Sequence, residues 1–546
     1  MHRRTFLTGG TAAVAAVATA AGRPGGAGGG SFGTGSASAS GTGSTSGTGF
    51  VPGTGSASRA LSGTADGKVP LRTASAVAAA DWAALDRSLD GALIRPGDAS
   101  WTAARQLYNT RFDTLRPAAV AYVAHPDDVR TALAYARAHG TGVAVRNGGH
   151  SYGGWSSGDG RLILDVSRLN RVRASGRSAV VGAGAKLIDV YRALAARGVT
   201  IPAGSCPTVG VSGLVLGGGH GVVSRAYGLT CDSLTGATVV TADGRLLTAD
   251  ATHHEDLFWA LRGAGHGNFG VVTELRFATH PAPRAVTGRL SWPWSRAAAV
   301  VRAWQEWGPS QPDEIWSALH LTSTPGGTPR ISVSAFCIGT HGQLQNAVDR
   351  LAHRVGASAT TVSLRRRSYE EAMEVYAGCS SFATDAQCHL PGPTPGRSPR
   401  GALGRETYAA RSDFFDRSLP EAGVRALLRQ LESVRGGSGS VALTALGGAV
   451  NRVSPTATAF VHRRSRMLAQ YLVSWRAGTT GATARSWLAE AHGAMAPHAS
   501  GAAYQNYADP TLPNGRKAYY GPALPRLTRV KRTYDPTGFF TYPQSL

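Results

Sequence analysis

Residues 146–154 read RNGGHSYGG, and residues 204–221 read GSCPTVGVSGLVLGGGHG. Each stretch places one nucleophilic side chain, the imidazole of His150 or the thiol of Cys206, inside a glycine-rich run. Glycine reaches backbone conformations that other residues avoid and lets a ligand approach the chain closely. Successive amides in such loops form concave sites for anions. The two stretches together therefore predict loops that hold a diphosphate and bond covalently to the ring system attached to it.

The two stretches differ from the common nucleotide-binding loops. Neither has the lysine and serine or threonine ending of a P-loop, and the cluster Gly217–Gly221 lacks the strand, spacing and acidic residue of a Rossmann site. Tight turns remain the alternative for either stretch alone. For His150 the alternative is a loop histidine bonded to backbone, and for Cys206 it is a buried thiol or half of a disulfide. The pair, in this order, favours cofactor binding.

Both stretches resemble the FAD-linked oxidases of the vanillyl-alcohol oxidase type, berberine bridge enzyme-like branch. In that branch the histidine of the first stretch is attached to the 8α-methyl carbon of the flavin, and the cysteine of the second to flavin C6. Such bonds form through a neutral imidazole nitrogen and a thiolate. The resemblance covers the chain from about residue 113 and implies FAD bound covalently through His150 and Cys206. Ala523 and Gly538 depart from it, since the branch usually has asparagine there.

The resemblance also implies which other residues contact FAD. They belong to the two loops and to the segments that follow them: Arg146, Asn147, Gly148, Gly149, Ser151, Thr208, Val209, Gly210, Gly213, Gly217, Gly218, Gly219, His220, Asp232, Gly270 and Val272. No cysteine and histidine spacing matches a zinc site, so no metal is predicted.

Oxidation of an alcohol by a flavin requires a group that takes the hydroxyl proton. The branch uses a tyrosine near a Tyr-x-Asn-Tyr pattern, which matches Tyr504 and Tyr507, with Tyr507 slightly favoured. Because the ordinary tyrosine pKa is about 10, we expect a cationic or hydrogen-bonding neighbour that lowers it. Asn451 and Tyr152 match substrate-pocket positions. The alternatives are packing at a domain seam for the tyrosines and a turn for Asn451.

The first residues indicate export. Arg3 and Arg4 precede an apolar stretch, Thr11 to Ala21, which is too short to span a bilayer and ends near a small-residue cleavage box. We therefore predict a twin-arginine signal peptide at 1–21, a secreted protein and no stable membrane insertion. Residues 22–75 are rich in Gly, Ser and Thr and predict a flexible linker. The resemblance places an FAD-binding domain at 113–284 and a C-terminal berberine-bridge-type module, which returns to that domain, at 501–546. The pattern of residues changes near 285, so the substrate-binding domain is placed at 285–500.

Apolar periodicity supports an α+β fold. The first half alternates helices, at 125–140 and around 187–194, with strands at 143–146 and 162–164. The second half has strands at 289–294, 314–322, 330–338, 440–446 and 467–475, and helices at 297–307 and 343–355. The resemblance implies that the first half is a two-lobed FAD-binding domain of the vanillyl-alcohol oxidase type. The mix of strands and helices in the second half predicts a substrate domain whose antiparallel sheet is covered by helices.

The composition of the chain limits the classes of binding partner that can be predicted for it. The chain has 546 residues, 42% of them apolar, and a net charge of +23. Its arginines are spread along the chain with no basic run between aromatics, so nucleic-acid binding is not predicted. Cys379 and Cys388 are close enough for a local disulfide, which export permits, while Cys231 and Cys337 lie in apolar surroundings typical of buried thiols.

These features favour an exported FAD-dependent oxidase that turns an alcohol or sugar hemiacetal into a carbonyl or lactone and reduces molecular oxygen to hydrogen peroxide. One alternative is an oxidoreductase or dehydrogenase that tailors a secondary metabolite. Another is a secreted flavoprotein without turnover, whose domain from residue 285 presents a carbohydrate surface. Four tryptophans could contribute to that surface, although their helical and strand spacing is more typical of core residues: Trp292, Trp294, Trp304 and Trp307.

Overall fold

The computed structural model describes residues 79–546, so the predicted signal peptide and linker lie outside the described residues. The first sheet has the order β1-β2-β4-β3. β2 (Ala119–Tyr122) and β3 (Val143–Arg146) run parallel to β4 (Leu162–Asp165), and β1 (Ala92–Ile94) is antiparallel to β2. α3 (Pro126–Ala138) connects β2 to β3 and buries the predicted apolar face. α1 (Ala79–Arg87) and α2 (Trp101–Arg105) precede this unit.

A second sheet follows, with the order β5-β6-β10-β8-β9 and every pair antiparallel. Its strands are β5 (Val172–Ser175), β6 (Ser178–Gly182), β8 (Leu234–Val240), β9 (Leu246–Asp250) and β10 (Val271–Ala278). The helices of this lobe are α4 (Leu187–Ala195), α5 (Val211–Leu216), α6 (Ser224–Tyr227) and α7 (Glu255–Ala264). The short strands β7 (Val199–Thr200) and β11 (His280–Pro281) pair with each other. The two glycine-rich stretches thus follow β3 and β7.

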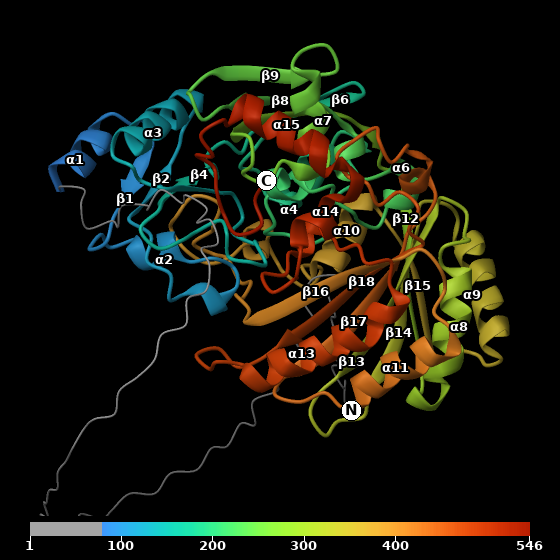
Figure 1. Cartoon of the computed structure of the whole chain (residues 1–546). Helices are drawn as coiled ribbons and strands as arrows, with labels where there is room; N and C mark the ends of the chain where they lie inside the picture. Colours follow the sequence, from blue (N-terminus) through green and yellow to red (C-terminus); the bar gives the residue numbers. More distant parts are fainter. Residues whose placement is uncertain (1–78) are drawn as a thin grey trace, which may run out of the picture. The chain divides into compact units, whose positions relative to one another are not determined.

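The second half forms a seven-stranded antiparallel sheet with the order β15-β12-β14-β13-β17-β18-β16. Four helices cover one of its faces (Figure 1) and share an apolar core with it: α8 (Ala297–Trp307), α9 (His341–Val355), α11 (Glu421–Glu432) and α13 (Ala482–Met495). The strands are β12 (Ala285–Trp292), β13 (Ile315–Ser323), β14 (Arg330–Cys337), β15 (Thr361–Arg367), β16 (Tyr408–Phe415), β17 (Ser438–Ala445) and β18 (Met467–Ser474). The predicted sheet covered by helices is confirmed.

Both edge strands of this sheet, β15 and β16, were absent from the sequence-based expectation. β15 ends in Arg365-Arg366-Arg367, a run that reads as solvated surface. Sheet edges commonly carry such charges, because charged side chains prevent pairing with another chain. β16 carries Arg411 and Asp413 among aromatic residues, which obscures the alternation of a strand.

Three of the four tryptophans proposed as a carbohydrate surface belong to the interior, and Trp294 is half-buried. Trp292, Trp304 and Trp307 are buried in the core between sheet and helices, and their indole N–H groups donate to Ala357 O, Ser317 Oγ and Ala347 O. The Trp294 indole donates to Glu432. A binding surface built on these four side chains is therefore wrong.

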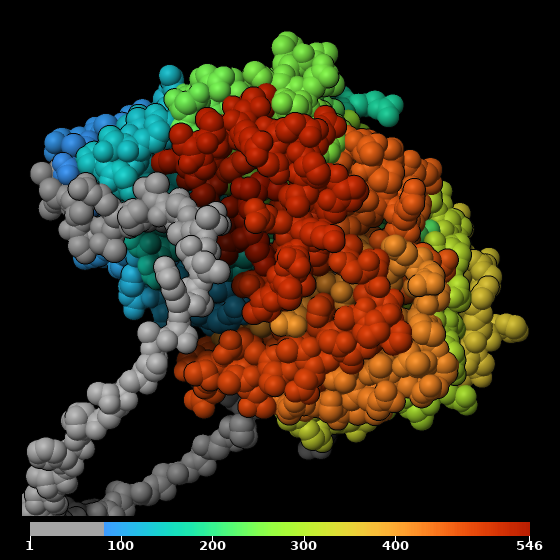
Figure 2. Space-filling view, viewed as in Figure 1, coloured from blue at the N-terminus to red at the C-terminus, as the bar shows by residue number. Residues whose placement is uncertain are grey.

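The C-terminal residues return to the first half of the chain. α15 (Leu524–Tyr534) packs against α7, and the Lys531 ammonium donates to the backbone of Asn268 at 2.6 Å. Ahead of it, α14 (Gly515–Tyr520) follows a single 3-10 turn, η7 (Gln505–Tyr507), which lies beside β16. The space-filling view shows these residues, in red, between the part coloured green and the part coloured orange (Figure 2).

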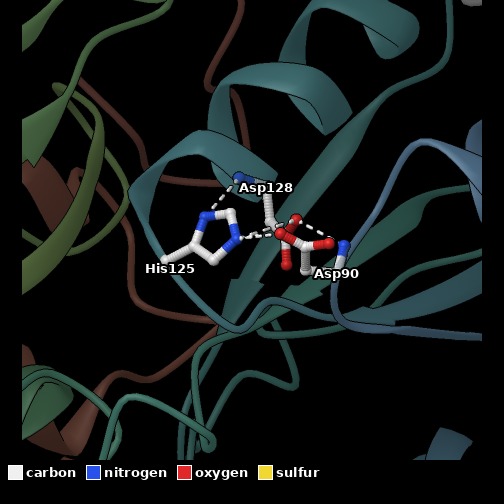
Figure 3. A group of neighbouring side chains, drawn as sticks. All are labelled: Asp90, His125 and Asp128. Carbon is white, nitrogen blue, oxygen red and sulfur yellow. Dashed lines mark hydrogen bonds and ion pairs between the residues drawn. The ribbon is translucent and has the colours of Figure 1, made fainter.

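A small polar cluster fastens the loop before β1 to the start of α3 (Figure 3). His125 Nε2 lies 2.7 Å from a carboxylate oxygen of Asp90, and the three side chains Asp90, His125 and Asp128 could together offer metal ligands. However, the Asp128 carboxylate accepts from the backbone amides of Asp90, Gly91 and Ala124. Because the Asp128 oxygens already accept these hydrogen bonds, we interpret the cluster as a structural contact that holds the loop before β1 against α3, and not as a metal site.

Cysteine pairing agrees with the expectation from the sequence. Cys379 and Cys388 form a disulfide, which packs against Ile188 of α4. Cys231 and Cys337 are buried free thiols. Within residues 79–546 there is no helix of the length and apolarity that crossing a membrane requires.

Buried neutral histidines make the fold sensitive to acid. Burial lowers the pKa of His220, His320 and His462 to about 4, whereas an unfolded histidine titrates near 6.5. Between these values the unfolded chain binds more protons, so stability is fully present above pH ~6.5 and declines as the pH falls. Each histidine should remove about 2 kcal/mol of unfolding free energy between pH 7.5 and pH 5.

Urea unfolding at these two pH values measures this loss. In the His320→Gln variant, the difference in unfolding free energy between pH 7.5 and pH 5 should be smaller by the amount that one histidine contributes. Equal unfolding free energies at pH 7.5 and 5 would contradict the assignment of neutral buried histidines.

Candidate active site

One cavity of about 270 Å³ collects most of the predicted site residues. It lies where the two glycine-rich loops, the C-terminal segment and the seven-stranded sheet meet. The predicted residues that line it are His150, Cys206, Asn147, Gly148, Gly149, Ser151, Tyr152, Val209, Gly210, Gly213, His220, Tyr504 and Tyr507. Segments that are distant in sequence therefore share one chamber.

The two loops are packed directly on each other. A methyl group on Gly148 would collide with the Thr208 carbonyl oxygen and lie 2.6 Å from the Gly210 nitrogen, so only glycine fits there. Asn147 Nδ2 donates to Ser212 Oγ at 3.2 Å, and His150 Nε2 is 2.8 Å from Thr208 Oγ1. Thr208 therefore does not line the cavity itself, but its hydroxyl contacts His150, which does.

His150 is held as a neutral imidazole. Its ring stacks on Tyr108, with centroids 4.0 Å apart and planes 20° apart. Burial, and secondarily the nearby Lys186 ammonium, lower the His150 pKa to about 3. Lys186 is fixed by Asn147 Oδ1 at 2.5 Å and Ser167 Oγ at 2.9 Å. A neutral imidazole is the nucleophilic form that attachment to an electrophilic carbon requires.

Cys206 differs from the expected thiolate. Burial, followed by the charge of the Glu406 carboxylate, raises the pKa of its thiol to about 12. The side chain is therefore protonated near neutral pH, and forming the nucleophilic thiolate requires local removal of the proton. Glu406 is itself a weak acid here, because burial raises its pKa to about 7.

The two candidate bases have different surroundings. The Tyr504 hydroxyl accepts from the Gly219 amide at 2.9 Å and from Asn506 Nδ2 at 2.6 Å, so it anchors the second loop. The Tyr507 hydroxyl instead lies 2.9 Å from His220 Nε2. Burial, and then the neighbouring Tyr152 and Tyr504, raise the pKa of Tyr507 well above its ordinary value. The expected lowering of a tyrosine pKa is therefore wrong, although a hydrogen-bonding neighbour is present.

Tyr152 forms one wall of the cavity beside Tyr507. The two rings are parallel within 10° and their centroids are 5.3 Å apart. Gln470 Nε2 of β18 donates to the Tyr152 hydroxyl at 2.6 Å, and Tyr408 of β16 meets the same ring edge-on. The seven-stranded sheet therefore fixes a residue of the first loop.

Several predicted cofactor residues support the site from outside the cavity. Arg146 pairs with Asp165 at 2.5 Å below the first loop, and Asp232 pairs with Arg463 at 2.7 Å. The remaining ones are glycines or apolar residues of tightly packed backbone: Gly217, Gly218, Gly219, Gly270 and Val272. At Gly219, φ is +80° and a side chain would collide with Thr230, so this run requires glycine for close packing.

Asn451 lies away from the cavity. Its Oδ1 accepts from the Gly447 amide at 3.1 Å, and its Nδ2 donates to the Ser465 carbonyl at 3.0 Å. Both polar groups are used to hold a turn. A substrate contact by Asn451 is not supported by this position.

The cavity also contains residues that sequence reasoning missed. They are mostly aromatic or polar and come from strands, loops and the last residues of the chain: Trp155, His266, Trp316, Tyr408, Asn506, Tyr542 and Gln544. Strand alternation at 314–322 could have placed Trp316 on one sheet face, but which face meets the loops depends on the tertiary fold.

These residues fit a flavin cofactor. Ligand sites are mostly apolar and aromatic, with a few converging polar groups, and this cavity has that character. His150 and Cys206 line it together, and Tyr108 is a neighbour of both: it stacks on His150, and the charge of Cys206 contributes to raising its pKa. Gly213 exposes backbone with open space where a side chain would stand. Fold and site together define a flavin-dependent oxidoreductase.

Comparison with known proteins gives the family. Residues 117–250 match the FAD binding domain model, and residues 503–546 match the model of berberine and berberine-like proteins. The chain belongs to the berberine bridge enzyme-like FAD-linked oxidoreductases. It is 30% identical to an FAD-linked oxidoreductase of Bacillus subtilis, YgaK, over 84% of this chain and 97% of that protein.

Two further relatives carry named activities. The chitooligosaccharide oxidase of Gibberella zeae is 31% identical, over 82% of this chain and 91% of that protein. The structure of a xylooligosaccharide oxidase from Myceliophthora thermophila, in complex with xylobiose, superposes with a TM-score of 0.75 at 28% identity. It covers 85% of this chain and 98% of its own.

Proposed function

We propose that this protein is an exported, FAD-dependent carbohydrate oxidase that oxidises a sugar hemiacetal or a related alcohol and releases hydrogen peroxide. The observation that carries this proposal is the meeting of His150, Cys206 and Tyr507 around one cavity. The similarity to a chitooligosaccharide oxidase and a xylooligosaccharide oxidase supports a carbohydrate substrate.

His150 and Cys206 would hold the cofactor covalently. The neutral His150 imidazole is ready to bond, whereas the Cys206 thiol must first lose its proton. When bound, FAD supplies acceptance of a hydride and later transfer of two electrons to oxygen. The two loops and the aromatic wall of the cavity would surround the reacting part of the substrate.

Tyr507 is the residue that takes the substrate hydroxyl proton. Its hydroxyl lines the cavity and has a side-chain partner, His220, that is free to take part in proton transfer. Tyr504 is less suited, because a backbone amide and Asn506 already fix its hydroxyl as an acceptor. Tyr152 would contact the substrate from the cavity wall, and Gln470 holds the Tyr152 hydroxyl in place.

A panel of oligosaccharides and glycosylated metabolites, with oxygen consumption and peroxide release measured together, tests this activity. We expect turnover with oligosaccharides that have a free reducing end and none after borohydride reduction of that end. Turnover with an artificial electron acceptor but no oxygen uptake would identify a dehydrogenase instead. No reduction of the flavin by any carbohydrate would overturn the substrate class.

Export by the twin-arginine route rests on residues 1–21. This route carries folded proteins, which suits a flavin loaded before export. Replacing Arg3 and Arg4 by lysine should keep the flavoprotein inside the cell. Unchanged secretion of that variant would contradict the route.

A further inference from the structure

His220 occupies a fixed place at the edge of the cavity. It stands between Gly219 and Gly221, and a side chain on Gly221 would collide with the Ala203 carbonyl. Only 8% of His220 is exposed. Its ring meets Tyr507 edge-on, with centroids 5.8 Å apart and planes 82° apart, so that Nε2 lies 2.9 Å from the Tyr507 hydroxyl oxygen.

The surroundings keep this imidazole neutral. The side chains that face the pair are aromatic or uncharged: Tyr504 beside His220, and Tyr152, Tyr504 and Cys206 around Tyr507. Burial alone lowers the His220 pKa to about 4, so the ring carries an unprotonated nitrogen at neutral pH. Among the described residues, His220 Nδ1 is buried without a hydrogen-bond partner. The contact of Nε2 with the Tyr507 hydroxyl is thus the hydrogen bond through which this ring acts.

Tyr507 is poorly suited to act as a stored phenolate. Its ring is buried, and it is stacked on a second tyrosine rather than beside a cation. A buried group that gains a charge without a compensating partner is strongly disfavoured. A proton taken from the substrate therefore needs a place beyond the tyrosine oxygen.

We propose that His220 is that place: as the substrate hydroxyl gives its proton to the Tyr507 oxygen, the Tyr507 hydroxyl proton passes to His220 Nε2. The C–H bond of the substrate breaks with its electron pair leaving as hydride to FAD, and the carbon becomes a carbonyl. Tyr507 ends neutral and His220 ends as an imidazolium, which balances the negative charge gained by the reduced cofactor. This inference rests on the proposed function, and it makes His220 a positioning residue that acts through Tyr507.

Nitrogen NMR of histidine-labelled protein tests the ground state without turnover. At pH 7 we expect His220 Nε2 to be the unprotonated, hydrogen-bond-accepting nitrogen, and its resonance to move when Tyr507 is replaced by phenylalanine. His220→Gln assigns the signal by its disappearance. A protonated Nε2 that donates to Tyr507 at pH 7 would overturn the inference, even if the enzyme oxidises no carbohydrate.

Anaerobic rapid mixing with substrate tests the proton transfer. His220→Gln keeps a hydrogen bond but cannot hold the proton, and should slow flavin reduction by roughly 10²-fold at pH 7. The rate of flavin reduction in the wild-type protein should increase as the pH is raised through about 4 and should stay constant above that pH. In the variant the rate should keep rising toward alkaline pH, because Tyr507 must then lose its proton to solvent.

Rescue separates this role from a structural one. The rate of flavin reduction in the His220→Ala variant should increase in proportion to the concentration of added imidazole. The His320→Gln variant is the matched control. His320 lies on β13 outside the cavity, and burial lowers its pKa to a similar value. Level pH profiles in both His220 variants, with no response to imidazole, would show that His220 only packs. Absent turnover in the wild type would instead count against the proposed function.

Discussion

Tyr507→Phe is expected to slow flavin reduction by carbohydrate roughly 10³-fold while leaving FAD attached. The reason is that the phenyl ring keeps the stacking on Tyr152 but removes the hydroxyl that contacts His220 and is proposed to take the substrate proton. General acid–base groups typically contribute 10²- to 10⁴-fold to a rate. Stopped-flow absorbance under anaerobic conditions measures this step directly.

Tyr504→Phe is the comparison for this prediction. It removes a hydroxyl that accepts from Gly219 and Asn506, and a neutral hydrogen bond contributes only about 1 kcal/mol. We expect less than a roughly tenfold change in reduction rate, together with a small loss of stability. A larger loss in Tyr504→Phe than in Tyr507→Phe would reverse the assignment of the base.

The double replacement His150→Ala with Cys206→Ala is expected to abolish covalent FAD. Each single variant should keep FAD attached through the remaining residue, because both side chains line the same cavity. In the His150→Ala variant, attachment through Cys206 should be faster at alkaline pH, since the thiol must ionise and its pKa is raised to about 12. The fraction of protein that keeps yellow absorbance after denaturation and gel filtration measures attachment.

Cys231→Ala controls for the loss of a thiol as such. Cys231 is fully buried and lies outside the cavity, so both attachments should persist. Release of FAD from one single variant would show that the remaining residue does not hold the cofactor covalently by itself. Equal attachment rates at neutral and alkaline pH in His150→Ala would contradict the protonated state of Cys206.

Features that lie within a short stretch of sequence could be predicted, whereas features that depend on contacts between distant stretches could not. The two loops carry their glycines and nucleophiles within short runs. These runs were enough to recognise the resemblance to a family in which both loops hold one flavin, and the resemblance implied that they meet. Tyr408 and Gln470 escaped notice because they act through the register of β16 and β18, which brings Ser412 opposite Gln470. Single-sequence periodicity indicates a strand but not its neighbour or the face that meets another domain.

The electrostatic expectations failed for a related reason. The sequence suggested a thiolate at Cys206 and a tyrosine with a lowered pKa, since both are useful chemically. Tyr507 is buried and Cys206 is half-buried, and removal from water disfavours the charged form of each side chain. The sequence also could not show that His220 is the hydrogen-bond partner of Tyr507. The two residues are 287 positions apart and meet only because the C-terminal segment returns to the first half of the chain.

The mass of the intact purified protein after acid denaturation tests the central claim most directly. We predict the mass of the polypeptide plus one FAD, with proteolytic mapping of the added mass to the peptides that contain His150 and Cys206. The bare polypeptide mass, with FAD recovered free in solution, would contradict the account.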